Sequence, residues 1–428
     1  MRVMILSPFT NSILREHLDL KEYGGLTKWI ISKLGLSKKI ALKDTAPWVG
    51  QLIEELEKQP GVELFSVSPQ IRMRRRVGHF KSGNTTYYFY SPEYSSALRL
   101  IEKYKLWKKL QNCSNRVLRI AKKIKPDIVI AYGTENPVIS VPQLSLIKQY
   151  PVLCVLQTIY NNPERVKYSV PSKLIQELER DIVDNIPYYG TGDLAYYNLL
   201  MGMNKEVKVL NFKNPRARLP EIAVPEKKYD YVNFAFTMDS RKGDYDSIKA
   251  LAIVRDKYPE VSLNIAGGLD PQRKAYLEKL VNESGLQNNV SFTPLFERKE
   301  DMYRHVLQAR FAVLPVKLDL VSTTTREAMY YGLPVITNIT PGTPELNKEK
   351  QCVLLAEKGN VESLANCMIE VMENEQLAHT LAENGHEYME RQIANSHSMT
   401  MQLNILKAVV DNYKNGTAIP WELYTKIN

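Results

Sequence analysis

Two acidic residues and a run of hydroxyl side chains lie close together near the middle of the second half of the chain. Asp319 and Glu327 flank a segment that holds Ser322, Thr323, Thr324 and Thr325. The apolar run 311–314 predicts a buried strand, and the threonines open a predicted helix that stops at Gly332. The first N–H groups of a helix are unpaired and carry partial positive charge, so this turn favours a phosphate. The alternative is a solvated Asp319 and a Ser322 that only caps a structural helix.

Two further turns follow predicted strands of the same half. One places two cations and a flexible glycine at the start of a helix predicted over 245–258, namely Arg241, Lys242 and Gly243. In the other, Gly267 and Gly268 end a strand, where missing side chains would let a ligand approach the backbone. Each glycine could instead serve only turn geometry. Because parallel strands end at one sheet edge, the three turns together indicate a nucleotide diphosphate.

Common phosphate motifs are missing from the sequence. It has neither a Gly-x-x-x-x-Gly-Lys-Ser/Thr run nor a strand-linked Gly-x-Gly-x-x-Gly. This argues against a P-loop NTPase and against a dinucleotide dehydrogenase. A different phosphate geometry is expected.

With these residues, the second half resembles the C-terminal domain of family 4 retaining glycosyltransferases of the GT-B fold. Their motif places two glutamates eight positions apart and continues Glu-Ala-Met-x-x-Gly-x-Pro-Val. Here Asp319 takes the first place and Glu327 the second, followed by Ala328, Met329, Gly332, Pro334 and Val335. The resemblance implies that Glu327 holds the ribose hydroxyls and that Asp319 faces the donor sugar. It also implies that the backbone at 323–325 holds the diphosphate.

The same family carries Gly-Arg and, a few residues later, Lys-Gly, whose cations neutralise the leaving diphosphate. Lys242 and Gly243 match, but Phe236 and Thr237 stand at the Gly-Arg positions. Arg241 is the candidate substitute cation.

The first half resembles a subgroup of enzymes of bacterial surface polysaccharide assembly, which place Gly-Thr-Glu after one strand. Gly133, Thr134 and Glu135 match this pattern, and the alternative for Glu135 is a helix cap. Gln157 stands in the region where many relatives have a histidine that contacts the donor sugar. Gly25, with Gly24, resembles the glycine loop that approaches the donor phosphates.

The strand and helix patterns predict two Rossmann-like, doubly wound α/β domains that face each other across a cleft. The first domain is predicted over 1–213 and is completed by the tail 395–428. A linker is predicted over 214–228, and the second domain over 229–394. Predicted strands of the first domain are 2–7, 62–67, 84–90, 127–131, 152–156, a short one by Tyr188, and 207–211. Its helices are predicted near 25–36, 48–58, 95–124 and 172–183 and from Asp193 onward. Strands of the second are predicted at 232–236, 261–266, 290–293, 311–314, 335–337 and 352–355, and the tail is helical over 361–413.

Charge is unevenly distributed along the chain. The formal net charge is +10, and residues 1–210 hold 31 Lys and Arg against 19 Asp and Glu. Basic residues concentrate over 72–81 and 103–125, where Trp107 lies among lysines as in a helix on a lipid surface. An anionic membrane surface is therefore a candidate partner and a solvated basic face the alternative. No recognisable motif supports nucleic acid. The four cysteines lack metal spacing, and no apolar run is long enough to span a bilayer. We expect a cytoplasmic protein that could attach to the inner membrane face.

The expected activity is transfer of a sugar from a UDP-, GDP- or other nucleotide diphosphate sugar to a hydroxyl of a glycan or lipid-linked glycan. The resemblance implies retention at the anomeric carbon, no metal and no cofactor. The acceptor is expected near residues 72–94, where tyrosines could stack on sugars or pack a strand, namely Tyr87, Tyr88, Tyr90 and Tyr94. Two alternatives remain open, a nucleotide-sugar epimerase of GT-B fold and a catalytically weak partner subunit.

Overall fold

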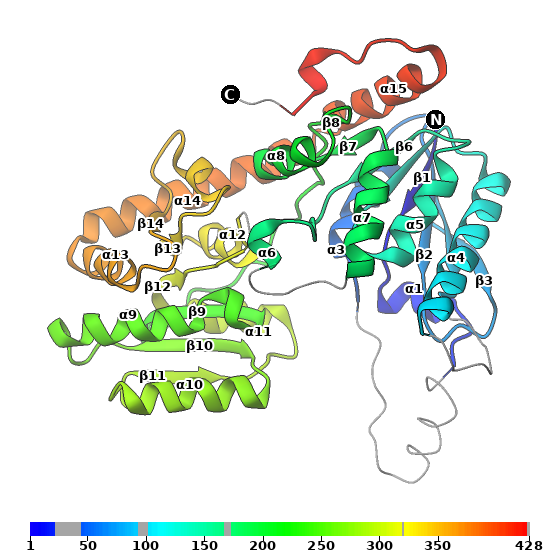
Figure 1. Cartoon of the computed structure of the whole chain (residues 1–428). Coiled ribbons are helices and arrows are strands. Elements are labelled where there is room, and N and C mark those ends of the chain that lie inside the picture. The colour runs from blue at the N-terminus through cyan, green and yellow to red at the C-terminus, as the bar shows by residue number, and fades with distance from the viewer. Residues whose placement is uncertain (22–43, 93–101, 167–172, 319–320, 426–428) are drawn as a thin grey trace, which may run out of the picture. The chain divides into compact units, whose positions relative to one another are not determined.

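The computed structural model describes residues 1–21, 44–92, 102–166, 173–318 and 321–425, with the side chains of 102–109 and Val166 excepted. Gly25, Asp319, Tyr94 and the helix expected near 25–36 lie outside the described residues. The chain forms two compact units, unit 1 from Met1–Ala217 with Ser396–Asn428 and unit 2 from Arg218–Asn395 (Figure 1). The segment 211–228, which leads from one unit to the other, has no helix or strand.

Unit 1 is built on an eight-stranded sheet of order β3-β4-β2-β1-β5-β6-β7-β8. Its strands are β1 (Arg2–Leu6), β2 (Glu63–Pro69), β3 (Val77–Ser82), β4 (Thr85–Tyr90), β5 (Ile128–Tyr132), β6 (Val152–Val155), β7 (Tyr188–Gly190) and β8 (Lys208–Leu210). Its helices are α1 (Ser12–Glu16), α3 (Pro47–Glu57), α4 (Glu102–Ile124), α5 (Pro137–Leu146), α6 (Pro163–Val166), α7 (Lys173–Asn185), α8 (Leu194–Met203) and α15 (Thr400–Asn415).

One strand of unit 1 departs from the predicted parallel sheet. β3 pairs antiparallel with β4, and its other side is the open edge of the sheet. The turn at Ser82–Gly83 joins the two strands as a hairpin, and Gly83 has a φ of 59°. The sequence pattern located the turn but missed β3, because none of the side chains of this edge strand is buried and it contains no apolar run.

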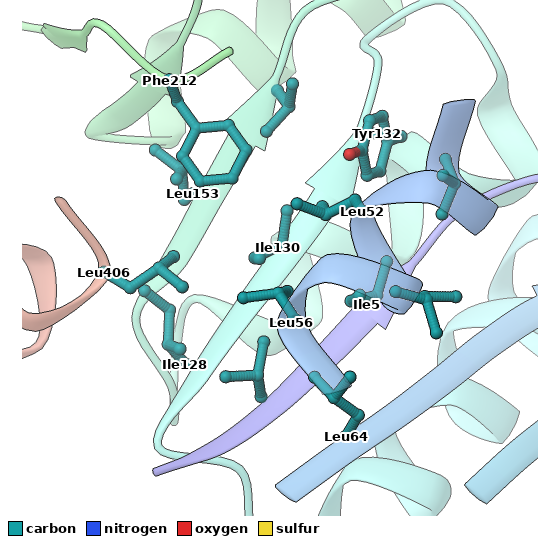
Figure 2. Packing of buried hydrophobic residues seen from close by; sticks show 14 of the residues in the cluster. Ile5, Leu52, Leu56, Leu64, Ile128, Ile130, Tyr132, Leu153, Phe212 and Leu406 are labelled. Carbon is teal, nitrogen blue, oxygen red and sulfur yellow. The ribbon is translucent and has the colours of Figure 1, made fainter. Parts of the chain in front are cut away.

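The core of unit 1 joins segments from both ends of the chain. Ile5 on β1, Leu56 on α3, Ile130 on β5 and Leu406 on α15 belong to one fully buried cluster (Figure 2). Removing a leucine side chain from water contributes about 2 kcal/mol, so α15 is held to unit 1 chiefly by such contacts. The tail after residue 396 is thus an integral part of this unit.

Unit 2 has a six-stranded parallel sheet of order β11-β10-β9-β12-β13-β14. The strands are β9 (Tyr229–Thr237), β10 (Leu263–Gly268), β11 (Val290–Thr293), β12 (Ala309–Leu314), β13 (Val335–Asn338) and β14 (Leu354–Ala356). The helices are α9 (Asp244–Lys257), α10 (Pro271–Glu283), α11 (Lys299–Val306), α12 (Thr323–Tyr330), α13 (Val361–Glu373) and α14 (Glu375–Ser396). Buried clusters lie on both faces of the sheet. Two Rossmann-like α/β domains are therefore confirmed.

Among the described residues, no helix has the length and apolar character needed to cross a bilayer. The cysteines are free thiols, and Cys113, Cys154 and Cys352 are buried.

Candidate functional site

The strand order of unit 2 reverses between β9 and β12. From β9 the chain moves outward through β10 and β11, and then returns to place β12 on the other side of β9. The loops that leave two such strands diverge, and open α/β sheets bind their ligands there. The predicted phosphate turns follow β9 and β12, so the structure brings both to this switch point. The turn at Gly267 and Gly268 ends the neighbouring strand β10.

The N-terminus of α12 forms around Ser322. Its Oγ accepts a hydrogen bond of 3.0 Å from the Thr325 N–H, so Ser322 is the N-cap. Thr325 is fully buried and its N–H is occupied. The N–H groups of Thr323 and Thr324 have no partner among the described contacts. The diphosphate amides expected over 323–325 are therefore reduced to two.

Glu327 is buried on α12 and faces groups from α11. Its Oε1 accepts from the Tyr303 hydroxyl at 2.8 Å and lies 3.5 Å from Lys299 Nζ. Burial raises the pKa of Glu327, while Lys299, Tyr303 and Lys242 act in the opposite direction. Oε2 has no partner among the described residues. An accessible carboxylate oxygen without a donor, on a side chain that is otherwise buried, is suited to accept hydrogen bonds from ligand hydroxyls.

Lys242 reaches the same place from the β9–α9 loop. Its charge partly opposes the rise in the pKa of Glu327 that burial causes. Arg241 is held differently, because its Nε lies 3.0 Å from Oδ1 of Asp239. Arg241 thus carries its own carboxylate partner, while Asp239 also caps the short turn at 240–242.

The first turn of α9 carries two carboxylates that sequence reasoning missed. Asp244, fully buried, pairs with Arg273 at 3.0 Å, and Asp246 pairs with Lys317 at 3.0 Å. Together they have an Asp-x-Asp spacing, a pattern that can bind a metal. Here Asp244 faces a cation of the first turn of α10 and Asp246 a cation of the loop after β12, so the two carboxylates fasten α10 and that loop to α9. These carboxylates also offset the positive end of α9, which leaves side chains rather than the helix end to attract an anion.

Two of the candidate glycines lie where the backbone of a neighbouring segment approaches closely. At Gly267, with a φ of 133°, an added Cβ would lie 1.8 Å from the Ala235 carbonyl oxygen. At Gly243, with a φ of 75°, it would lie 2.3 Å from the Pro315 carbonyl oxygen. The space of each missing side chain is thus taken by a neighbouring strand end, and both glycines are required to bring the loops together.

We expect Gly267→Ala to destabilise unit 2 by several kcal/mol. The added Cβ would force the end of β9 at Ala235 to move, and the backbone at residue 267 would be strained as well. Gly332→Ala is the matched control: Gly332 also has a positive φ, of 68°, but nothing lies within 4 Å of its added Cβ. The control should cost about 1–2 kcal/mol, from the backbone conformation alone. Urea unfolding of both variants checks this, and equal losses would contradict the close contact.

In unit 1, Glu135 and Gln157 follow the neighbouring strands β5 and β6. The carboxylate of Glu135 turns back over Gly133, where an added Cβ would lie 2.2 Å from Oε2. Glu135 Oε2 and Gln157 Nε2 are both buried without a hydrogen-bond partner. Asn136, not Glu135, caps α5. The helix-cap alternative for Glu135 is therefore wrong, and one acceptor and one donor remain unpaired at this sheet edge.

Glu179 on α7 holds the loop that follows Gln157. Fully buried, it accepts hydrogen bonds from Thr134 Oγ1 at 2.7 Å, from Tyr160 N at 2.9 Å and from Asn161 N at 2.6 Å. Sequence reasoning missed this residue. A signal existed, because Glu179 falls at a helical spacing shared with the buried Leu178 and Ile182.

Burial raises the pKa of Glu135 to about 7, Glu179 adds to the rise, and nearby backbone N–H groups oppose it. Between the ordinary value of 4.5 and about 7, the folded protein holds a proton that the unfolded chain has lost. Stability should therefore fall as pH rises through this window, by about 3 kcal/mol in total. Urea unfolding of the parent protein and of Glu135→Gln at about pH 4.5 and about pH 7 measures this change. The free energy of unfolding should fall between the two pH values more in the parent protein than in the variant. A constant difference between the two proteins would contradict it.

The tyrosines proposed for sugar stacking are packed into the sheet. Tyr87, Tyr88 and Tyr90 are 9%, 6% and 0% exposed. Strand packing, the alternative reading, is correct for these three, and they offer no open ring face to an acceptor.

Comparisons with known proteins agree with this architecture. The fold of two Rossmann-like units is shared with glycosyltransferases of the GT-B fold. Residues 215–388, nearly all of unit 2, match the family described as Glycosyl transferases group 1. An uncharacterized glycosyltransferase of Haemophilus influenzae is 24% identical over 40% of this chain and 48% of its own.

Similar folds are found among solved structures. Sucrose-phosphate synthase of Thermosynechococcus elongatus has a TM-score of 0.63 at 18% identity, covering 94% of this chain and 98% of the other. HepE of Anabaena, solved with UDP, has a TM-score of 0.60 at 14% identity, covering 95% and 100%. The chain spans between about a third and two thirds of the curated relatives it matches.

Proposed function

We propose that this protein is a retaining glycosyltransferase that moves a sugar from a nucleotide diphosphate sugar to an acceptor hydroxyl. The observation that carries the proposal is that one helix at the sheet switch point presents both free N–H groups and a carboxylate oxygen without a donor. Thr323 and Thr324 supply the N–H groups and Glu327 the oxygen. The match of residues 215–388 to glycosyl transferases group 1 supports the same reading.

Each group has a role in the proposed reaction. Glu327 Oε2 accepts hydrogen bonds from the ribose hydroxyls, and the Thr323 and Thr324 amides bind the diphosphate. Lys242 stabilises the negative charge that grows on the diphosphate as the bond to the anomeric carbon breaks. Because these groups are positioned before the reaction, they supply positive charge without a metal. Arg241 contributes less, since Asp239 already neutralises it.

The new glycosidic bond forms on the face from which the diphosphate departs. The acceptor oxygen bonds to the anomeric carbon, and its proton passes to the departing diphosphate oxygen. No protein nucleophile takes part. Asp319 is proposed to face the donor sugar, and Glu135 and Gln157 to contact sugar hydroxyls, which can both donate to Glu135 and accept from Gln157.

We propose bacterial surface polysaccharide assembly as the setting, with a glycan or lipid-linked glycan as acceptor. Calorimetric titration with UDP-, GDP- and ADP-sugars, followed by product analysis, tests the proposal. Binding of a donor together with acceptor-dependent transfer and a retained anomeric configuration supports it. Donor turnover without an acceptor points to an epimerase, and no binding to any donor points to a noncatalytic subunit.

A further inference from the structure

A basic surface that takes no part in the proposed reaction runs along the open edge of the unit 1 sheet. We call it the edge stripe, and it consists of six exposed cations, namely Arg74, Arg75 and Arg76 in the β2–β3 loop, Lys81 on β3, and Lys122 and Lys123 on α4, with the partly buried Arg116 of α4 beside them. β3 and α4 lie at the same side of unit 1 (Figure 1). Tyr88 of β4 connects the two elements. Lys123 Nζ lies 5.8 Å from the centre of the Tyr88 ring, on which His79 of β3 stacks. Burial lowers the pKa of Arg116, and the charge of Arg76 lowers it further.

Most of these cations are not neutralised by the protein. Arg74 pairs with Asp19 at 3.0 Å. Within the described part of the chain, Arg75, Arg76 and Lys81 form no ion pair with a carboxylate. The edge stripe therefore presents a row of like charges to solvent, which repel one another until an anionic surface approaches.

An exposed apolar residue, Ile71, precedes the arginines of the edge stripe in the β2–β3 loop. Ile71 is 48% exposed and directly precedes Arg72, whose φ of 63° is rare for a residue with a side chain. Ile13 on α1 is 66% exposed, and α1 lies close by, because Thr10 donates a hydrogen bond of 3.3 Å to Gln70. Isoleucines next to arginines suit the boundary between lipid headgroups and acyl chains.

We propose that the edge stripe, with Ile71, docks unit 1 onto an anionic membrane surface. The cations would lie against the charged headgroups while Ile71 inserts beneath them. A polyanion such as nucleic acid would bind the arginines but would not contact an exposed isoleucine, so Ile71 favours a membrane. The other explanation is edge protection, since charged residues on an open strand prevent it from pairing with a second copy.

The test uses the full chain and vesicles of phosphatidylcholine, alone or mixed with phosphatidylglycerol. We expect flotation with the mixed vesicles only, weakened by salt. The triple variant Arg75→Ser, Arg76→Ser, Lys81→Ser should bind about a hundredfold more weakly, because each cation near such a surface contributes roughly a factor of five. Ile71→Ser should weaken binding several-fold without changing its salt dependence.

The matched control removes three charges from unit 2, by Lys274→Ser, Lys279→Ser and Lys348→Ser. These lysines are exposed and each lies near a glutamate of its own segment. The control should bind the mixed vesicles as the parent protein does. Equal losses in both triple variants would overturn the proposal, as would unchanged binding of the edge variant. Self-association of the edge variant with full vesicle binding would establish edge protection, and binding to duplex DNA in place of vesicles would establish a nucleic-acid surface.

Discussion

Glu327→Ala should lower donor affinity about a hundredfold and abolish measurable transfer. Hydrogen bonds to a charged group contribute about 1.5–3 kcal/mol each, and the variant removes the acceptor proposed for two ribose hydroxyls. Glu327→Gln keeps the size of the side chain and the contact with Tyr303, so we expect an intermediate loss of about tenfold. Calorimetry with the donor and a transfer assay measure both effects.

The fold should survive these substitutions at Glu327. Burial already raises the pKa of this carboxyl, so a neutral glutamine is tolerated better by the surroundings than the ionised acid. Glu278→Ala on α10, an exposed glutamate in an i,i+4 pair with Lys274, is the control and should leave donor affinity unchanged. If Glu327→Ala bound and transferred like the parent protein, the proposed role of the carboxylate would be wrong.

Arg273→Met should cost unit 2 about 3–5 kcal/mol and lower its melting temperature by about 10 °C. The variant leaves the fully buried Asp244 without its guanidinium partner, and an uncompensated buried charge is among the most destabilising changes known. The neighbouring Lys274→Met is the control. Lys274 and Glu278 are about half exposed and 3.4 Å apart, so this pair contributes less than about 1 kcal/mol.

The double variant Asp244→Asn, Arg273→Met separates charge from packing. It should recover part of the lost stability, because the buried charge is removed together with its partner. If Arg273→Met were as mild as Lys274→Met, Asp244 would not depend on the guanidinium. Donor affinity should fall with Arg273→Met as well, since Arg273 joins the start of α10, which follows the Gly267–Gly268 turn, to α9.

Local patterns were sufficient to predict the strands of unit 2 and most of unit 1. Val232, Phe311 and Val335 belong to apolar runs that end in turn residues, so each strand was marked by its own sequence. β3 was missed, because this strand pairs only with β4 and its side chains are not buried, so its sequence has no apolar pattern. The edge strand depends on the hairpin with β4, which is a tertiary relation.

The sequence by itself determined the class of fold and the motif at the site, because both depend on residue types at short spacing. The turn from Ser322 to Glu327 is such a motif, and the two sheets follow from alternating strands and helices. Only the tertiary structure decided the partners. Asp244 with Arg273, Asp246 with Lys317 and Glu327 with Tyr303 join residues far apart in sequence. The physical reason is that ionic and hydrogen-bonded pairs depend on distance in space, which follows from the strand order and not from the spacing of residues along the chain.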